Sequence, residues 1–414
     1  MSAVAERIGV VLPPTQGSWD AYSTAAPVVW KEKEMYYMLY QGWKKPEEGN
    51  WRTRPGRLIG LATSKDGLRW DKYDGNPVIV GDGESWDEIG FEVSYLVKVD
   101  SEYRLYYTGI SDGIPRIGLA FSKDLRTWRK YEGNPILDIG PKGSFDENGV
   151  AFPSVLRCKG GWRMIYGGYG PLPERTCQLG LAISNDGLRW EKYPHNPVHR
   201  ARSWRSFDAY VEAHHTFSLG DHYVTLHEAI GRDNRYNIGV IYSPDLMVWA
   251  RCPENPLFPL TEHSVKQDMS VVHPWLLLED LMLYYVEVNG FRVLDQHVIK
   301  AARIKPELLV PHRQRSLSFP LWFNRRMSPN GEISSAISCE TFNKKTFYLM
   351  SDKDGTVKVE IDPAGLDQWV SFRECTIRAG RLWFEMTTYS FNRARLVFNP
   401  AEDANVFAYI ILEK

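Results

Sequence analysis

The chain has 414 residues, a formal net charge of −1, and aromatic residues that make up 13% of the sequence. This balance of charge gives no electrostatic reason to expect nucleic acid or an anionic membrane as a partner. No apolar run reaches the roughly 18 residues that are needed to cross a bilayer. The segment Met1 to Val11 is too short and too polar for a signal peptide, so we expect a cytoplasmic location.

The cysteines give no sign of a disulfide framework or a zinc site. Their number is odd and no pair has the spacing of metal ligands: Cys158, Cys177, Cys252, Cys339 and Cys375. Reduced thiols are the simplest interpretation, and we expect neither a metal nor a cofactor.

A repeat organises the first three quarters of the chain. Four segments of the form Ser-x-Asp, with a Trp four residues after the Asp, each lead to an Asn-Pro step, at Asn76, Asn134, Asn196 and Asn255. These steps lie roughly 60 positions apart, and such a period indicates a propeller or a solenoid. An aromatic-Asp pair interleaves with them at Trp19-Asp20, Trp86-Asp87, Phe145-Asp146 and Phe207-Asp208, and Gln267-Asp268 holds the fifth place.

Within each unit, the pattern of hydrophobic residues predicts four short antiparallel strands. Five such units predict an all-β, five-bladed propeller, whose closed ring protects the strand edges. The Ser-x-Asp segment is most simply a turn with a packed Trp.

The fifth unit lacks its outer strand, and we expect Arg7 to Leu12 to supply it. After Lys305-Pro306 the repeat stops, and short strand-like runs between turn residues indicate a small antiparallel β-sandwich. The predicted domains are therefore a propeller over residues 1–310 and a sandwich-like domain over 311–414.

The first strand of each blade lines the channel of a propeller, where a pocket is expected. Aligning the units on their second strands puts five residues at one depth: Ala25, Glu92, Ala151, Glu212 and Ser270. Glu92 and Glu212 would face each other from blades that are not neighbours. Two facing carboxyl groups are what glycoside cleavage needs, one as acid and one as base or nucleophile. Pairing of each glutamate with an Arg or a backbone N–H is the structural alternative.

Other polar and aromatic residues could line the same pocket in the channel. Asp20 and Asp268 could serve as the partner of Glu212, although the repeated aromatic-Asp pair also suits a structural role. His214, His215 and His273 could contact a polar ligand; with a carboxylate they could in principle bind a metal, but their spacing matches no strong metal motif. Possible stacking walls, for each of which core packing is the alternative, are Trp19, Tyr22, Trp86, Phe91 and Tyr210.

From Asp20 to Lys305 the chain resembles the furanosidase superfamily of five-bladed propellers, glycoside hydrolase families 43 and 32. The segment Glu212-Ala213-His214-His215 before a Tyr-containing strand is similar to the family 43 segment Glu-Gly-Pro-His. That glutamate is the family's general acid, so the resemblance implies this role for Glu212. The sequence departs from the family at its two catalytic Asp positions, where Ala26 precedes Pro27 and Phe152 precedes Pro153.

Three functions remain open from the sequence. The first is an enzyme that cleaves or transfers a glycosidic bond, with Glu212 as acid and Glu92, Asp20 or Asp268 as its partner. A phosphorylase variant would use a cluster of basic residues such as Arg202, Arg205, Arg232 and Arg235. The second is a propeller that binds a sugar or another small molecule without turnover, and the third is a biosynthetic enzyme with non-hydrolytic chemistry. In each case the expected partner is a small molecule or an oligosaccharide, and the oligomeric state is open.

Overall fold

The computed structural model describes residues 5–45, 58–80, 86–87, 91–170, 177–200, 210–220, 222–230, 236–252, 255–258, 269–289, 296–309, 316–339 and 342–413. Nearly all regular structure in these ranges is β-strand, with one short 3-10 helix, η1 (Pro306–Leu308). Among the described residues, no helix has the length and apolar character needed to cross a membrane. The chain divides into two compact units, of which the first is Met1–Gly220, Val224–Ile241 and Glu254–Leu309.

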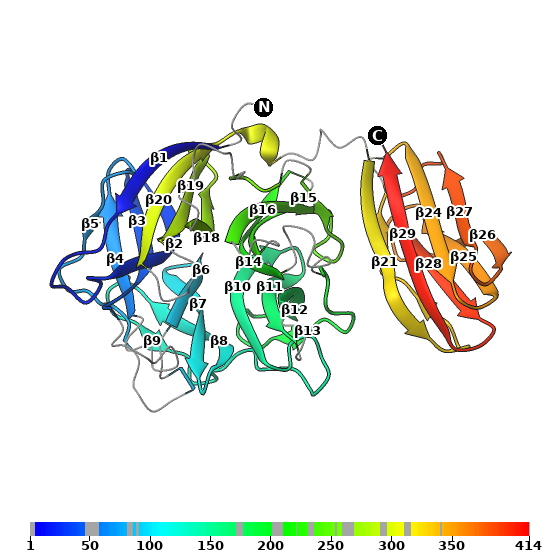
Figure 1. Ribbon diagram of the computed structural model, residues 1–414, viewed down its shortest axis with the longest axis horizontal. Helices are drawn as coiled ribbons and strands as arrows, with labels where there is room; N and C mark the ends of the chain where they lie inside the picture. The colour runs from blue at the N-terminus through cyan, green and yellow to red at the C-terminus, as the bar shows by residue number, and fades with distance from the viewer. Residues whose placement is uncertain are drawn as a thin grey trace. The chain divides into compact units, whose positions relative to one another are not determined.

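The described residues from Ala5 to Ile304 form five antiparallel four-stranded sheets, which confirms the predicted five-bladed propeller (Figure 1). In the first four blades the strands follow chain order from the inside outward. Their bounds are β2 Ser23–Glu32, β3 Met35–Trp43, β4 Leu58–Ser64 and β5 Asp71–Lys72; β6 Phe91–Val99, β7 Glu102–Ser111, β8 Ile114–Ser122 and β9 Arg129–Lys130; β10 Gly149–Cys158, β11 Gly161–Tyr169, β12 Cys177–Ser184 and β13 Glu191–Lys192; β14 Tyr210–Leu219, β15 His222–Ile230, β16 Tyr236–Ser243 and β17 Ala250–Arg251.

The fifth blade is built from both ends of this unit. Its order is β18 (Met269–Leu277), β19 (Met282–Asn289), β20 (Gln296–Ile304) and then β1 (Ala5–Leu12). β1 pairs antiparallel with β20, with Arg7 opposite Ala302 and Leu12 opposite Ile299. The outer place that the sequence analysis assigned to Arg7 to Leu12 is thus filled by β1.

A buried ion pair with two further partners recurs in the first three blades. In the third blade, Lys192 donates to Asp146 Oδ2 at 2.6 Å, and Tyr166 donates to the same atom at 3.1 Å. Asn196 of the Asn-Pro step donates to the Tyr166 hydroxyl at 3.2 Å. The same four partners are Asp20, Lys72, Tyr40 and Asn76 in the first blade, and Asp87, Lys130, Tyr107 and Asn134 in the second. In these three blades the aromatic-Asp repeat is therefore a structural device that ties the entry of the blade to its outer strand.

The Ser-x-Asp segments form turns that the aspartate holds together. In the second blade, Asp124 Oδ1 accepts the backbone N–H groups of Arg126 at 2.9 Å and Thr127 at 2.8 Å. The indole of Trp128 then donates to the carbonyl of Leu125 at 3.0 Å. These hydrogen bonds favour the charged carboxylate, so they lower the pKa of Asp124 to about 2. Asp186 lies in the equivalent turn of the third blade, and its pKa is also about 2, although burial opposes the hydrogen bonds there.

These two aspartates predict a loss of stability in acid. Their pKa values in the folded protein lie below the value of about 3.9 of an unfolded chain. Their contribution is therefore present above pH ~4 and is lost as the pH falls toward 2. The double variant Asp124→Asn, Asp186→Asn keeps the acceptor oxygens but does not titrate. Urea unfolding between pH 5 and about 2 should show a shallower pH dependence for this variant; an unchanged slope would contradict the assignment.

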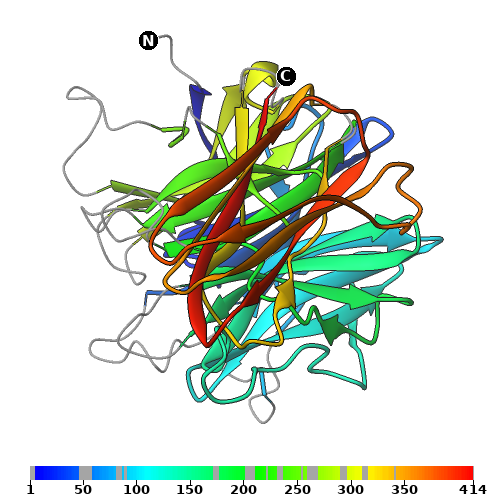
Figure 2. The ribbon, with the colours of Figure 1, turned by 90° about the vertical axis from the view of Figure 1, so that its right-hand side faces the viewer.

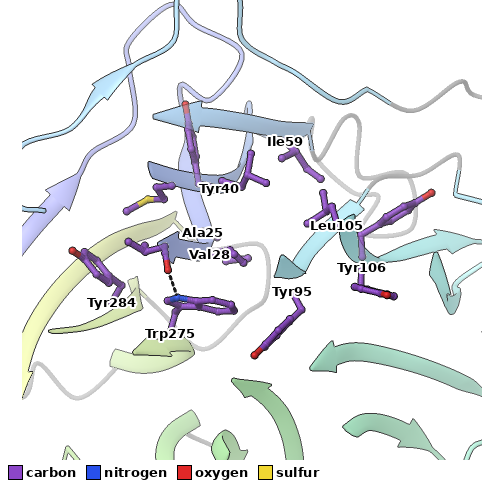
Figure 3. Packing of buried hydrophobic residues seen from close by; sticks show 14 of the residues in the cluster. Ala25, Val28, Tyr40, Ile59, Tyr95, Leu105, Tyr106, Trp275 and Tyr284 are labelled. Carbon is purple, nitrogen blue, oxygen red and sulfur yellow. Dashed lines mark hydrogen bonds between the residues drawn. The ribbon is translucent and has the colours of Figure 1, made fainter. Parts of the chain in front are cut away.

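Aromatic rings join the inner strands of different blades. His215 of β14 stacks on Trp275 of β18 with ring centroids 3.9 Å apart, and Tyr95 of β6 lies 5.3 Å from Trp275. Trp275 donates its indole N–H to the carbonyl of Val29 in β2 at 2.6 Å, the contact drawn as a dashed line in Figure 3. Leu276 N donates to His215 Nδ1 at 3.1 Å. The inner ends of four blades are thus held together by stacked rings and hydrogen bonds.

The second unit consists of Asp221–Tyr223, Tyr242–Pro253 and Val310–Lys414. From residue 316 onward it forms two sheets, coloured yellow to red in Figures 1 and 2. The first has the order β21 (Ser316–Met327), β29 (Ala404–Glu413), β24 (Lys344–Ser351), β27 (Leu382–Thr387). The second has the order β22 (Glu332–Ile333), β28 (Arg393–Pro400), β25 (Gly355–Asp362), β26 (Val370–Ile377), with β23 (Ile337–Ser338) also on β28. A shared core with Phe347 from the first sheet and Leu396 from the second makes this an antiparallel sandwich.

Candidate active site

The inner strands carry a β-bulge at one recurring level. In the first blade Ala25 pairs with Gln41 and Val28 with Leu39, so one extra residue lies between them. The third and fifth blades repeat this shift after Ala151 and Val272. The residue that follows has a positive φ in each case: 46° at Ala26, 50° at Phe152 and 49° at His273. Non-glycine residues adopt this conformation only under constraint, and such positions concentrate at functional sites.

This register corrects the alignment of the fifth blade. The sequence alignment predicts that Ser270 lies level with Ala25, whereas the strand pairing places Val272 there. The length of the hairpin explains the error, because Ala25 lies 16 positions before its partner Gln41, whereas Val272 lies only 14 positions before its partner Val286. The hairpin of the fifth blade, shorter by two residues, shifts the inner strand by two positions, and His273 therefore shares the level of Ala26 and Phe152.

Glu212 lies on the inner strand of the fourth blade in a buried carboxyl pair. It is 4% exposed, and its neighbour Glu228, on the adjacent strand β15, is 3% exposed. The two carboxyl groups are hydrogen-bonded to each other, and Tyr169 donates its hydroxyl to Glu212 Oε1 at 2.5 Å. Burial first, and then the neighbouring charge of Glu228, raise the pKa of Glu212 well above its ordinary value. The pair can thus hold a proton between its carboxyl groups near neutral pH.

The third blade leaves room for the Glu212 side chain. A Cβ atom on Gly167 would lie 3.0 Å from Cys177 Sγ and 3.9 Å from Glu212 Cγ. The thiol of Cys177 is buried, and burial raises its pKa. Gly167 and Cys177 therefore form a close wall beside Glu212, and the thiol is in its neutral form.

Two histidines lie against Glu228. His214 Nε2 is 3.1 Å from Glu228 Oε2, but the angle is not that of a hydrogen bond. The backbone N–H of His273 donates to the same carboxylate oxygen at 3.1 Å. The two imidazole rings are 5.1 Å apart, and the ring of Phe152 lies 4.7 Å from that of His214. Burial lowers the pKa of His214 to about 4 and that of His273 well below its ordinary value. Both rings are therefore neutral at physiological pH.

Two of the predicted site residues lie in structural contacts away from the Glu212–Glu228 pair. Asp20 was a candidate catalytic residue, but it is fully buried in the structural ion pair with Lys72, as Asp87 and Asp146 are in their blades. His215 was a candidate ligand contact, and it lies in the stack with Trp275 instead.

The predicted stacking walls are also mostly packing residues. Trp19 packs on Tyr40 with ring centroids 5.6 Å apart, and Trp86 packs on Tyr107 with ring centroids 5.8 Å apart. These contacts correspond to the core-packing alternative. Tyr22 packs against the propeller core and donates its backbone N–H to the carbonyl of Trp43 at 3.1 Å. The side chains of Phe91 and Tyr210 lie outside the described part of the structure.

The partner of Glu212 stays a prediction. Glu92 is buried on β6 and pairs with Thr108, level with Ala25 and Ala151, as the alignment expected. Asp268 lies outside the described residues, and so do the four arginines considered for a phosphate: Arg202, Arg205, Arg232 and Arg235.

Sequence reasoning missed Glu228, Tyr169 and the contact of Phe152 with the histidines. A signal for Glu228 exists, because it follows Tyr223 by the same spacing that separates Gln41 from Tyr36. In the first blade that second-strand position pairs with Ala25, the counterpart of Glu212. An alignment that also compares the second strands therefore predicts that the two glutamates are neighbours.

Residues 21–160 match the glycoside hydrolase family 130 model, which is described as β-1,4-mannooligosaccharide phosphorylase. The match covers the first two blades and β10, and it ends before Glu212. A curated relative, the 1,2-β-oligomannan phosphorylase of Thermoanaerobacter, is 24% identical over 237 residues, which are 56% of this chain and 73% of that protein. An uncharacterized protein of Mycobacterium tuberculosis is 26% identical over 176 residues, 39% of this chain and 57% of its own length.

Solved structures show the same fold. A glycoside hydrolase has a TM-score of 0.58 at 20% identity, covering 73% of this chain and 92% of its own. A family 117 glycoside hydrolase of Zobellia galactanivorans has a TM-score of 0.56 at 17% identity, covering 74% of this chain and 93% of its own. A structure from a study of family 130 mannoside phosphorylases and hydrolases has a TM-score of 0.51 at 16% identity, covering 73% of this chain and 96% of its own. The first unit thus has the fold of propeller glycosidases, and the sequence similarity found is to family 130.

Proposed function

We propose that this protein is a glycoside-processing enzyme that cleaves β-mannosidic bonds, with Glu212 as the proton donor. The observation that carries the proposal is the buried Glu212–Glu228 carboxyl pair on the inner strands of a glycosidase-type propeller. The similarity to the family 130 model and to a 1,2-β-oligomannan phosphorylase supports the mannoside as the substrate class.

In this proposal, inorganic phosphate is the acceptor. The bond between the anomeric carbon and the glycosidic oxygen breaks, and a bond between that carbon and a phosphate oxygen forms. Glu212 gives its proton to the departing sugar oxygen, which is the step that a buried neutral carboxyl group can perform. The products are a mannose 1-phosphate and an oligosaccharide shorter by one unit.

The test is incubation of the purified full chain with β-1,2- and β-1,4-linked manno-oligosaccharides, each with and without inorganic phosphate. We expect shortening of one series only when phosphate is present, with mannose 1-phosphate as the co-product. Release of free mannose without phosphate would support cleavage of the mannosidic bond but would show that phosphate is not the acceptor. If neither series is consumed under either condition, the substrate class is wrong.

A further inference from the structure

A second feature of the site has no role in this proton transfer. His214 Nε2 and His273 Nδ1 are buried ring nitrogens without a hydrogen-bond partner. An unsatisfied buried polar atom costs about 1–3 kcal/mol, so native proteins seldom leave two of them side by side. Together with a carboxylate oxygen of Glu228, one ligand atom from each residue lies within 4.8 Å of the others.

The three side chains form a set of two imidazoles and one carboxylate. The neutral imidazole is the form that binds a metal, and burial keeps both rings neutral. Nitrogen-rich sets of this kind suit zinc and neighbouring divalent transition metals, whereas calcium takes six to eight oxygen ligands. Three protein ligands also leave a coordination position open.

Outer contacts hold these side chains in place. The backbone N–H of His273 and the carboxyl group of Glu212 both hydrogen-bond to Glu228. Hydrogen bonds to a ligating carboxylate are typical of metal centres, because they orient the ligand. His273 stands at the positive-φ position of the β-bulge, where the first and third blades have Ala26 and Phe152. The fifth blade thus places an imidazole at a strained position that its counterparts fill with apolar side chains.

We propose that His214, Glu228 and His273 bind one divalent transition-metal ion of the zinc type. The present 3.1 Å between His214 Nε2 and Glu228 Oε2 is close to the separation of two ligands that are each about 2 Å from a tetrahedral ion. Small rotations of the side chains would bring the third ligand atom into the same sphere. The ion would offset the negative charge of Glu228 beside Glu212, and its open position would be available to a water or a sugar hydroxyl.

The experiment measures metal binding, so its result does not depend on the mannoside activity. The full chain is stripped with a chelator, and Co²⁺ is titrated in while the visible d–d absorption is recorded. Zn²⁺ content is then measured after dialysis. We expect one equivalent of bound metal, a tetrahedral or five-coordinate Co²⁺ spectrum, and a higher thermal unfolding temperature with Zn²⁺.

Three variants separate this site from adventitious binding. His273→Asn is the least disruptive ligand variant, because asparagine tolerates a positive φ better than other residues. We expect this variant and His214→Gln to lose at least about tenfold in Zn²⁺ affinity, with an unfolding temperature of the metal-free protein near that of the wild type. His195→Gln changes an exposed histidine and should bind like the wild type. Less than stoichiometric binding by the wild type, or full binding by both ligand variants, would overturn the proposal.

Discussion

Replacing Glu212 by glutamine is expected to lower kcat/KM on the active manno-oligosaccharide by about a hundredfold or more. Glutamine fills the same volume and keeps a hydrogen bond from Tyr169, but it has no proton to give to the leaving oxygen. The initial rate of mannose 1-phosphate formation is the measurement. A larger loss on substrates with a poor leaving group than on an activated aryl mannoside would identify the missing step as protonation.

The matched control is Glu287→Gln. Glu287 is also a buried glutamate on a strand of the propeller, but its partners are Lys300 and Arg7. We expect its kcat/KM to stay within about threefold of the wild type. Glu92→Gln tests the predicted partner separately: a loss comparable to that of Glu212→Gln would support paired catalysis. A Glu212→Gln enzyme with the rate of the wild type would rule out the assigned acid.

Replacing Lys192 by methionine is expected to destabilise the propeller by about 3 kcal/mol. The substitution keeps most of the side-chain volume but leaves the carboxylate of Asp146, 2% exposed, without its cation. Tyr166 would still donate to this carboxylate, and the remaining exposure of Lys192 sets the value at the low end of the range for a broken buried pair. Chemical denaturation at neutral pH, monitored by tryptophan fluorescence, measures the change.

Arg189→Met is the control in the same blade. Arg189 is paired with Asp186, but its side chain is 89% exposed, so the variant should change the free energy of unfolding by less than about 1 kcal/mol. If Lys192→Met changes the free energy of unfolding as little as Arg189→Met does, the buried ion pair does not have the structural role that its recurrence in three blades indicates.

The propeller could be predicted from the sequence because its markers are local. The Ser-x-Asp turn, the Trp that packs on it and the Asn-Pro step stand close together in the sequence of each unit, so they can be recognised as a repeat. The role of β1 could be inferred as well, because a four-stranded pattern that lacks its last strand leaves an edge that must be covered.

The site was harder to predict because it depends on register. The hairpin of β18 and β19 is shorter by two residues than those of the first and third blades, which moves His273 relative to its counterparts, and no local marker reveals such a shift. Glu228 was not predicted because it lies on β15, the strand next to that of Glu212. The alignment compared residues only on the strands that line the channel. The contacts of Asp20, Trp19 and Trp86 also reach across a whole blade, as that of Asp20 with Lys72 does, so the local sequence does not predict them.

The bulges of the first, third and fifth blades have a consequence for how a ligand would be oriented. Five blades built to one plan could surround the axis with equivalent walls, but the bulge positions hold Ala26, Phe152 and His273. The fourth blade adds a carboxyl pair at the neighbouring level. The channel therefore has no rotational symmetry, and a sugar ring turned by one blade would meet a different wall. If the channel binds an oligosaccharide as proposed, this asymmetry would favour one orientation of the chiral sugar chain over the reverse one.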